Sequence, residues 1–259
     1  MIKNVYQHKH WEIFNPMEQA RLLSVLRGLA VAEPGRQLRA LDYGAGTGNV
    51  THKLLALGYH VTACDISPDS LELLKLEAKS EASLDTVTVD GSSLPFTDGQ
   101  FDLVTLYSVL HHVPDYLRLI RGLIGVLKPG GTLFIDHEFN GDHWSPSLYL
   151  DAYYELTRRS FVDYLKEVWS TGELITFDYF KGVFIKTFLD RRYEREGDLH
   201  VWPDDHIGWD KIVDLLQDCG CSVGKNVDYL LYRPKGGEKL YELFADRCAD
   251  MKYIVAIKP

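Results

Sequence analysis

The sequence predicts an α/β protein in which helices cover both faces of a doubly wound, mostly parallel sheet. Apolar or alternating stretches of strand length take turns with amphipathic stretches of helical length, which is typical of this class. A glycine-rich turn containing Gly44, Gly46 and Gly48 directly follows the first predicted strand. Because ligands bind beyond the carboxyl ends of parallel strands, we expect a ligand site at this turn.

The amino-terminal part predicts a helix ahead of the sheet. Residues 1–14 carry histidine and aromatic side chains on a polar background, and they form either a lid over the glycine turn or an arm. Asn15 and Pro16 suit the N-cap and the first position of a helix. Apolar residues extend this helix to about Ala32, and Glu-Pro-Gly at 33–35 ends it.

Strands and helices then alternate up to residue 139. We expect strands over residues 38–42, 59–64, 84–89, 101–106 and 132–136, and helices over 47–58, 67–79 and 116–127. The sequence Leu-Lys-Pro-Gly-Gly at 127–131 stops the last of these helices, as proline and glycine should. Asp42, Asp65 and Asp90 end three successive strands, so they lie at one edge of the sheet.

The rest of the chain contains an aromatic-rich insertion and a return to the sheet. We expect one long helix near 147–169, a less regular or β segment over 175–189, a helix over 205–219, and strands over 222–232 and 252–258. The insertion is either an acceptor-binding cap or a small accessory core or dimer surface, because aromatic residues mostly pack. The expected domains are an N-terminal helical cap (1–36), an α/β core (37–139), the insertion (140–203) and a C-terminal completion of the core (204–259).

The glycine turn predicts a particular kind of ligand. Glycines allow a close approach of the backbone, and the amides at a helix start favour a negative or electron-rich group. The spacing G-x-G-x-G, with Asp42 two residues before the first glycine, departs from the G-x-G-x-x-G of dinucleotide-binding proteins. Asp65 lies 21 residues after Gly44, where a carboxylate can bind the two ribose hydroxyls of an adenosine. The alternative is that Asp65 only caps the next helix.

Three motifs in the expected order resemble the class I methyltransferases that use S-adenosylmethionine (SAM): LRALDYGAGTGNVT at 38–51, LPFTDGQFDLVTLYSVLHHV at 94–113, and LKPGG before the fifth strand. The resemblance implies a Rossmann-like sheet of seven strands, with the last strand antiparallel between strands five and six. It also implies SAM as cofactor and S-adenosyl-L-homocysteine as product. The implied cofactor-binding residues are Asp42, Tyr43, Gly44, Ala45, Gly46, Gly48, Asp65, Ile66, Asp90, Gly91, Ser92, Tyr107, Ser108 and His112.

Methyl transfer from a sulfonium needs mainly proximity and orientation, and it needs a base only if the acceptor must lose a proton. The candidate catalytic residues are His111, His112 and Glu138. Each histidine can instead line the cofactor pocket without transferring a proton. Strand alternation places Asp136 and Glu138 on one face and His137 on the other. With His143, these residues form a cluster that can bind an acceptor hydroxyl or a divalent metal; we expect no metal site, because the ligands lack a recognised spacing.

The composition of the chain indicates which classes of partner and which cellular compartment to expect. The net charge of −9 disfavours a nucleic-acid acceptor. The four cysteines include no C-x-x-C pair, so reduced thiols in a cytoplasmic protein are expected. The polar amino-terminal sequence predicts no signal peptide, and no apolar run is long enough to span a membrane.

The sequence therefore predicts a SAM-dependent methyltransferase that modifies O, N or C of a small or medium-sized acceptor, which can be aromatic or glycosidic. Oligomerisation through the aromatic insertion is a further possibility. Two alternatives remain open. One is a non-catalytic binding or scaffold protein with the same fold, and the other is an NAD-linked oxidoreductase on a Rossmann-like scaffold.

Overall fold

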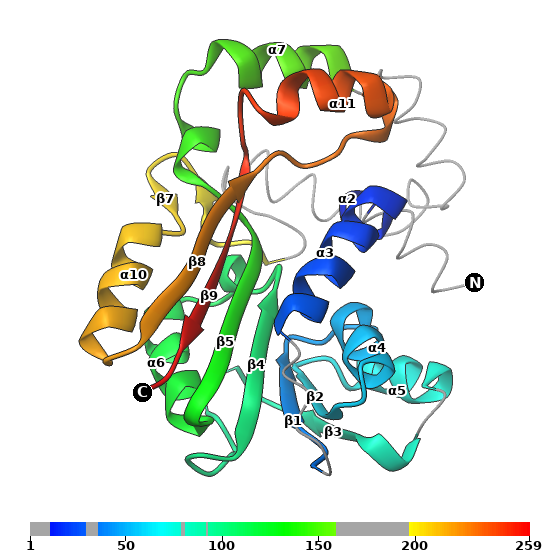
Figure 1. The fold of residues 1–259 in the computed structure, drawn as a ribbon, viewed down its shortest axis with the longest axis vertical. Helices are drawn as coiled ribbons and strands as arrows, with labels where there is room; N and C mark the ends of the chain where they lie inside the picture. The colour runs from blue at the N-terminus through cyan, green and yellow to red at the C-terminus, as the bar shows by residue number, and fades with distance from the viewer. Residues whose placement is uncertain (1–10, 30–35, 79–80, 92, 159–196) are drawn as a thin grey trace, which may run out of the picture.

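The computed structural model describes residues 11–29, 36–78, 81–91, 93–158 and 197–259. A seven-stranded sheet with the order β3-β2-β1-β4-β5-β9-β8 runs through the molecule (Figure 1). Its strands are β1 Arg39–Tyr43, β2 His60–Asp65, β3 Leu84–Thr88, β4 Phe101–Tyr107, β5 Leu127–Phe139, β8 Ser222–Tyr229 and β9 Met251–Ile257. Strands β1 to β5 pair in parallel, and β9 is antiparallel to both β5 and β8. The predicted doubly wound sheet and the inserted antiparallel strand are confirmed.

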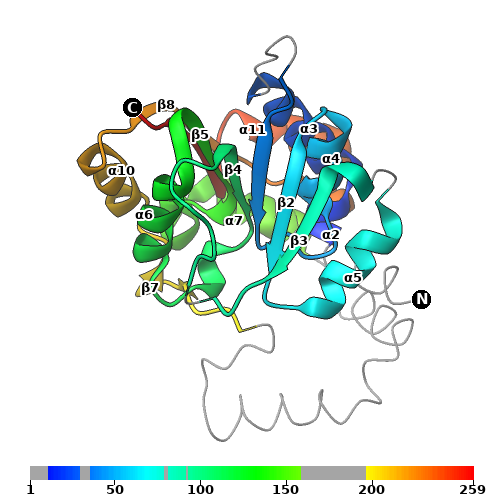
Figure 2. The same ribbon diagram turned by 90° about the horizontal axis from the view of Figure 1, so that it is seen from below.

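The helices lie on both faces of the sheet, as Figures 1 and 2 show. Helices α3, α4 and α5 cover one face, α6 and α10 cover the other, and α7 and α11 lie together beyond the ends of β8 and β9. Their bounds are α2 Trp11–Phe14, α3 Pro16–Leu29, α4 Asn49–Ala56, α5 Pro68–Glu77, α6 Tyr116–Val126, α7 Leu148–Thr157, α10 Trp209–Asp218 and α11 Gly237–Ala245. Short 3-10 turns occur at η1 Glu81–Ser83, η2 Leu110–His112, η3 Gly141–Trp144 and η6 Pro234–Gly236, and a small hairpin pairs β6 Val201–Trp202 with β7 Asp205–His206.

Strand alternation explains the two layers of core. On β4, Leu103 faces the layer that contains α3 and α4, whereas Val104 faces the layer that contains α6 and α10. Leu133 and Phe134 on β5 divide in the same way. All four side chains are buried, as expected for strands covered on both faces.

Local sequence determines several helix starts. The Asn15 side chain accepts a hydrogen bond from the Glu18 amide at 2.9 Å, so it caps α3 as predicted, with Pro16 at the first helical position. Ser67 caps α5 through the Ser70 amide in the same manner. The predicted strands and helices up to residue 126 match the structure to within a few residues.

Three boundaries differ from the prediction. Strand β5 already begins at Leu127, because the segment predicted as a helix stop pairs with β4 at Phe101 and bonds to Lys258. Helix α7 ends at Thr157, since Arg158 has an extended backbone, so the long helix predicted near 147–169 is wrong. Helix α10 begins at Trp209, because residues 205–206 belong to the small hairpin.

Helix α11 was not predicted from the sequence at all. Gly236 is its N-cap and Gly237 its first residue, and both favour a loop; Gly237 has a φ of 70°. The helix forms because its apolar side packs on α7, where Phe244 joins a buried cluster with Leu150 and Tyr153. The predicted segment over 175–189 lies outside the described residues.

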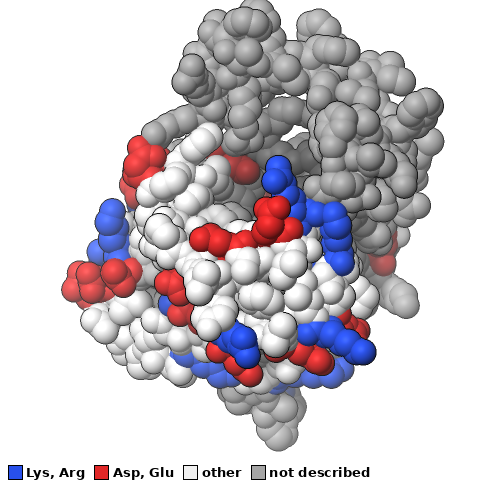
Figure 3. All heavy atoms as spheres, turned by 90° about the horizontal axis from the view of Figure 1, so that it is seen from above, with Lys and Arg blue, Asp and Glu red and all other residues white. Residues whose placement is uncertain are grey.

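The surface carries both signs of charge. On the face shown in Figure 3, basic and acidic side chains of the described residues lie interspersed among uncharged ones. Within the described ranges, none of the helices is both long enough and apolar enough to cross a bilayer.

Candidate active site

The predicted glycine turn connects β1 to α4. Gly44, Gly46 and Gly48 have φ values of 74°, 51° and 95°, a conformation that side chains of L-residues rarely adopt. The amide of Gly44 donates to the Cys64 carbonyl at 2.8 Å, which ties the turn to β2. A Cβ atom at Gly44 would lie 2.4 Å from Cγ2 of Val109, so the turn packs directly on the segment that follows β4. Glycine is therefore required there by both conformation and space.

Asp65 at the end of β2 is oriented by two backbone amides. Its Oδ2 accepts from Gly46 at 2.8 Å and its Oδ1 accepts from Ser67 at 2.9 Å. A carboxylate has about four acceptor positions, so two remain for a ligand. The next side chain, Ile66, is 69% exposed, an unusual exposure for a large apolar residue beside a glycine turn.

Asp42 is a buried acid beneath the same turn. It accepts hydrogen bonds from the hydroxyls of Thr51 at 2.6 Å and Thr105 at 2.9 Å. Burial raises the pKa of Asp42 to about 6, although these hydrogen bonds favour the ionised form. The carboxyl group therefore presents either a charge or a proton near neutral pH, at the wall of a cavity.

This cavity has a volume of about 400 Å³ and lies at the carboxyl ends of β1, β4 and β5. The structure brings together nine of the predicted site residues in its wall: Asp42, Gly44, Ala45, Gly46, Tyr107, Ser108, His111, His112 and Glu138. Others do not line it, namely Tyr43, Gly48, Asp65, Ile66, Asp90 and Gly91. Ser92 lies outside the described residues. The cavity thus covers only part of the site that the resemblance implies.

Several lining residues were not among the predicted site residues. Asn49, His137 and Arg233 supply polar groups, while Phe14, Phe139 and Met251 supply apolar ones. Nδ2 of Asn49 is buried and has no hydrogen-bond partner among the described residues, whereas its Oδ1 accepts from Lys53. Position 49 is the first residue of the helix after the glycine turn, which is the one sequence signal that points to it. The lining residues after 197 carry no such signal.

Glu138 is fixed by the turn after β4. Its Oε1 accepts from the amides of Val109 and Leu110 at 2.8 and 2.7 Å, and its Oε2 lies 2.8 Å from Nδ1 of His111. Asp198 contacts both histidines, at 3.1 Å from Nδ1 of His112 and 3.9 Å from Nε2 of His111. Glu138 therefore holds the turn and orients His111.

His111, His112 and Asp198 form the one group among the described residues whose ligand atoms are close enough to hold a metal ion. Those atoms lie within 4.8 Å of one another.

A β-bulge in β5 changes the faces predicted for residues 136–138. Ile135 pairs with Ile254 and Glu138 with Lys252, so Asp136 and His137 together lie opposite a single residue of β9. His137 and Glu138 consequently both line the cavity, while Asp136 turns toward α3. The prediction that Asp136 and Glu138 share a face is wrong, because simple alternation does not hold across a bulge.

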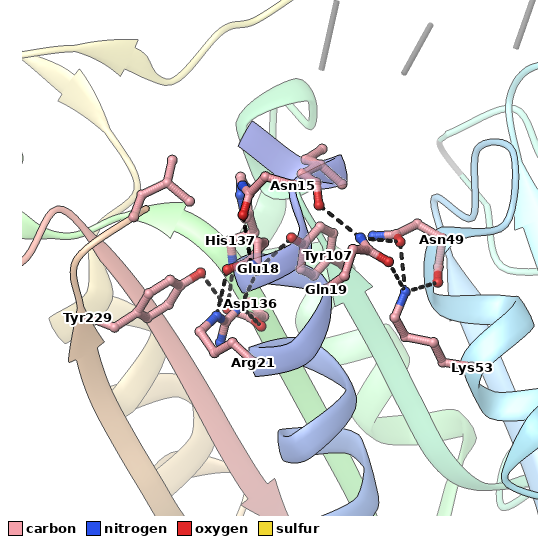
Figure 4. Close-up of polar contacts among 12 residues, drawn as sticks. Asn15, Glu18, Gln19, Arg21, Asn49, Lys53, Tyr107, Asp136, His137 and Tyr229 are labelled. Atoms are coloured by element: carbon pink, nitrogen blue, oxygen red, sulfur yellow. Dashed lines mark hydrogen bonds and ion pairs between the residues drawn. The ribbon is translucent and has the colours of Figure 1, made fainter. Parts of the chain in front are cut away.

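Behind this bulge lies a buried polar network, shown in Figure 4. Arg21 on α3 donates to Glu18 and, at 2.7 Å, to Oδ2 of Asp136. Glu18 also accepts from the hydroxyl of Tyr107 at 2.7 Å, and Asp136 accepts from Tyr229 at 3.0 Å. Burial raises the pKa of Asp136, and the Arg21 guanidinium opposes this shift. The network links α3 to β4, β5 and β8 directly beneath the cavity.

The fold and the cavity define a doubly wound α/β protein with a ligand site built around a glycine turn. Residues 41–135 match the family model of the methyltransferase domain. A ubiquinone biosynthesis O-methyltransferase of Xanthomonas campestris pv. campestris is 34% identical over 134 residues, which cover 49% of this chain and 55% of that protein. A demethylmenaquinone methyltransferase of Clavibacter sepedonicus is 38% identical over 97 residues, covering 38% and 40% of the two chains.

The fold is similar to that of a SAM-dependent methyltransferase from Mesorhizobium loti, with a TM-score of 0.58 at 19% identity over 91% of this chain and 96% of the other. Residues 41–135 of this chain therefore match a methyltransferase domain, and the fold is similar to that of a SAM-dependent methyltransferase. The chain spans about half the length of the curated relatives it matches. The residues that match the family model include the glycine turn.

Proposed function

We propose that this chain transfers a methyl group from SAM to a hydroxyl group of a small, largely apolar acceptor. The observation that carries the proposal is a single cavity with the glycine turn in one wall and the polar groups His137 and Glu138 in another. SAM supplies a methyl group on a good sulfonium leaving group. The chain has to hold the two reactants in line, exclude water and receive a proton.

Two features of the cavity fit SAM. The glycine turn lines the cavity, and a side chain at Gly44 would displace the turn by pressing on Val109. The unpartnered Nδ2 of Asn49 is a buried donor that a ligand carboxylate would satisfy, and the amino group of SAM would be attracted to the carboxylate of Asp42. Asp65 and Asp90 are our proposed contacts to the ribose and the adenine, because both lie at strand ends beside the turn.

The acceptor is proposed from the opposite part of the wall. Ile13, Phe14, Phe139 and Met251 make this part apolar, which suits a ring or a short hydrocarbon group. The curated relatives are named for ubiquinone and demethylmenaquinone, and the first is named an O-methyltransferase. A hydroxylated aromatic ring is therefore the acceptor class that we would screen first.

Thermal unfolding with SAM, S-adenosylhomocysteine, NAD and ATP tests the cofactor. A ligand at 100 times its dissociation constant adds about 2.7 kcal/mol of stability. We expect a shift with SAM and S-adenosylhomocysteine alone, in protein shown to be free of copurified cofactor. A shift with NAD instead would favour an oxidoreductase, and no shift with any of them would favour a scaffold protein.

Two glycine variants show whether the shift comes from this site. Gly44→Ala and Gly58→Ala both place a side chain at positive φ, at 74° and 89°, so both should lose about 1–2 kcal/mol of stability. Only the Cβ at 44 meets another side chain, since nothing lies within 4 Å of a Cβ at 58. We expect Gly44→Ala to weaken SAM binding at least tenfold and Gly58→Ala to leave it unchanged. Equal affinities would place the cofactor elsewhere.

A further inference from the structure

His137 is one of the cavity-lining residues that have a buried polar atom without a hydrogen-bond partner among the described residues. It lies in the β-bulge with a φ of 64°. Among the described non-glycine residues, only His137 and Ser108 have a positive φ, and Ser108 also lines the cavity. His137 is 5% exposed, and Nε2 is buried with no hydrogen-bond partner among the described residues. A buried imidazole nitrogen without a partner costs free energy unless a ligand satisfies it. The bulge therefore holds His137 where a bound molecule can reach it.

The other three histidines of the cavity wall, His111, His112 and His200, are already engaged by carboxylates, and Nδ1 of His200 lies 2.6 Å from Oδ1 of Asp205. Nδ1 of His111 is hydrogen-bonded to Glu138, and Nδ1 of His112 lies 3.1 Å from Asp198. His112 is also the more exposed of the two, with 38% of its side chain accessible. His137 differs because its ring contacts the Tyr107 ring, at 4.8 Å between centroids, rather than a carboxylate.

Charged side chains lie behind the bulge that holds His137. Asp136 accepts a hydrogen bond from the His137 amide at 2.7 Å, and the two side chains interact electrostatically. Two carboxyl groups, those of Glu18 and Asp136, and the Arg21 guanidinium lie behind the bulge. The titratable or charged groups that face this region are Tyr107 of β4, Asp136 and Glu138 of β5, Glu18 and Arg21 of α3, and Tyr229 of β8 (Figure 4).

We propose that Nε2 of His137 binds the acceptor hydroxyl and takes its proton during methyl transfer. This inference rests on the proposed function and deepens it. As the acceptor oxygen forms its bond to the methyl carbon, the carbon–sulfur bond breaks and its electron pair returns to sulfur. The hydroxyl proton moves to Nε2, which gives a methyl ether, S-adenosylhomocysteine and an imidazolium. Asp136 and its partners stabilise that imidazolium until the proton leaves to solvent.

A binding experiment tests this without requiring turnover. The complex with S-adenosylhomocysteine is titrated with 4-nitrophenol, whose phenolate absorbs at longer wavelength than the phenol, at a pH where the free probe is mostly protonated. We expect bound probe to appear as phenolate in the wild type. We expect His137→Gln and His137→Asn to bind the probe as neutral phenol. His137→Asn is included because asparagine tolerates a positive φ well, so this variant should fold even if His137→Gln does not. His60→Gln is the control and should behave as the wild type, because His60 lies on β2, outside the cavity wall, where it pairs with Asp85 of β3.

Kinetics provide a second measurement. With a phenolic acceptor, the loss of a general base lowers kcat by about 10²–10⁴-fold, while the thermal shift by S-adenosylhomocysteine should persist. The proposal is overturned if the wild type binds no probe, if it binds the probe as neutral phenol, or if the position 137 variants still generate phenolate. It is also overturned if His137→Gln retains full kcat. Failure of the cofactor itself to bind would instead contradict the proposed function, so the two failures are distinguishable.

Discussion

At the scale of single residues, the burial of Asp42 lowers the stability of the fold at neutral pH, and its carboxyl group lines the cavity. Its pKa of about 6 is above the ordinary 3.8, so the folded state binds a proton more tightly than the unfolded state. Stability is therefore lost as pH rises from about 4 to 6, and above pH 6 the ionised carboxylate costs about 3 kcal/mol. A buried carboxylate that lowers stability by this much is expected where a cationic group of a ligand binds.

Asp42→Asn should remove this pH dependence. We expect the variant to be about 1–3 kcal/mol more stable than the wild type at pH 7 and to show no advantage near pH 4, because the neutral amide avoids the burial of a charge. Urea unfolding at several pH values measures the difference. Thr51→Ala, which removes one hydrogen bond but keeps the acid, should lower stability instead. A constant difference between Asp42→Asn and wild type across pH 4–7 would contradict the argument.

The sequence predicted the residues of the site that belong to a local motif. Asp42, Gly44 and Gly46 could be predicted near the cavity because strand, turn and helix follow one another in the chain. Arg233 and Met251 were not found, because they reach the cavity only through the pairing of β9 with β5 and β8. His137 was grouped with its neighbours, but its aim into the cavity depends on a bulge that no local pattern indicates.

At the scale of secondary-structure elements, α3 is held to the sheet by one ionic cluster. The Arg21 guanidinium contacts Glu18 and Asp136, whose side chains are 2% and 0% exposed, and it stacks 3.9 Å from the Tyr229 ring. Two buried carboxylates therefore depend on one cation. Breaking a buried pair of this kind costs far more than breaking a surface pair.

Arg21→Met should destabilise the protein by about 3–5 kcal/mol, because it leaves buried carboxylates uncompensated. Lys75→Met is the control: Lys75 pairs with Glu72 at 3.5 Å on the surface of α5, and we expect a loss below about 1 kcal/mol. Denaturant unfolding of both variants measures the two values. Similar small losses would show that α3 is held by apolar packing of Leu22 and Leu26 alone.

Elements were predicted well where one local signal dominated. Helix α3 was predicted because a cap and a proline mark its start, and β2 because β-branched residues alternate along it. Helix α11 was missed because Gly236 and Gly237 suggest a loop, while its stability comes from contacts with α7 that are distant in sequence. The end of α7 at Thr157 likewise has no glycine or proline to mark it.

At the scale of the whole molecule, β9 joins two parts of the sheet. It pairs with β5 on one side and β8 on the other, and Ile254, Val255 and Ala256 are buried between the helical layers. Without β9, β8 has no partner in the seven-stranded sheet and β5 becomes an edge strand. The place of β9 between β5 and β8, which the family resemblance implied, therefore also contributes to the stability of the fold.

A chain that ends at Asp250 should lose cooperative thermal unfolding and any shift with SAM, because an open edge and the lost core cannot be compensated. A chain that ends at Ile257 keeps β9 and should unfold cooperatively, with a modest loss from the missing Lys258 contacts to Gly125 and Leu127. Circular dichroism and calorimetry distinguish the two. Cooperative unfolding of the shorter chain would show that β1 to β5 form a stable unit alone.

The position of β9 also has a consequence for synthesis on the ribosome. Strands β1 to β4 can pair once residue 107 has emerged, but β5 meets its second neighbour only when residues 251–257 appear, roughly 110 residues after β5 itself. At 5–20 residues per second, this interval lasts about 5–20 s. Throughout it, one edge of β5 exposes unpaired backbone groups, so we expect nascent chains of intermediate length to be the form of this protein that most requires a chaperone.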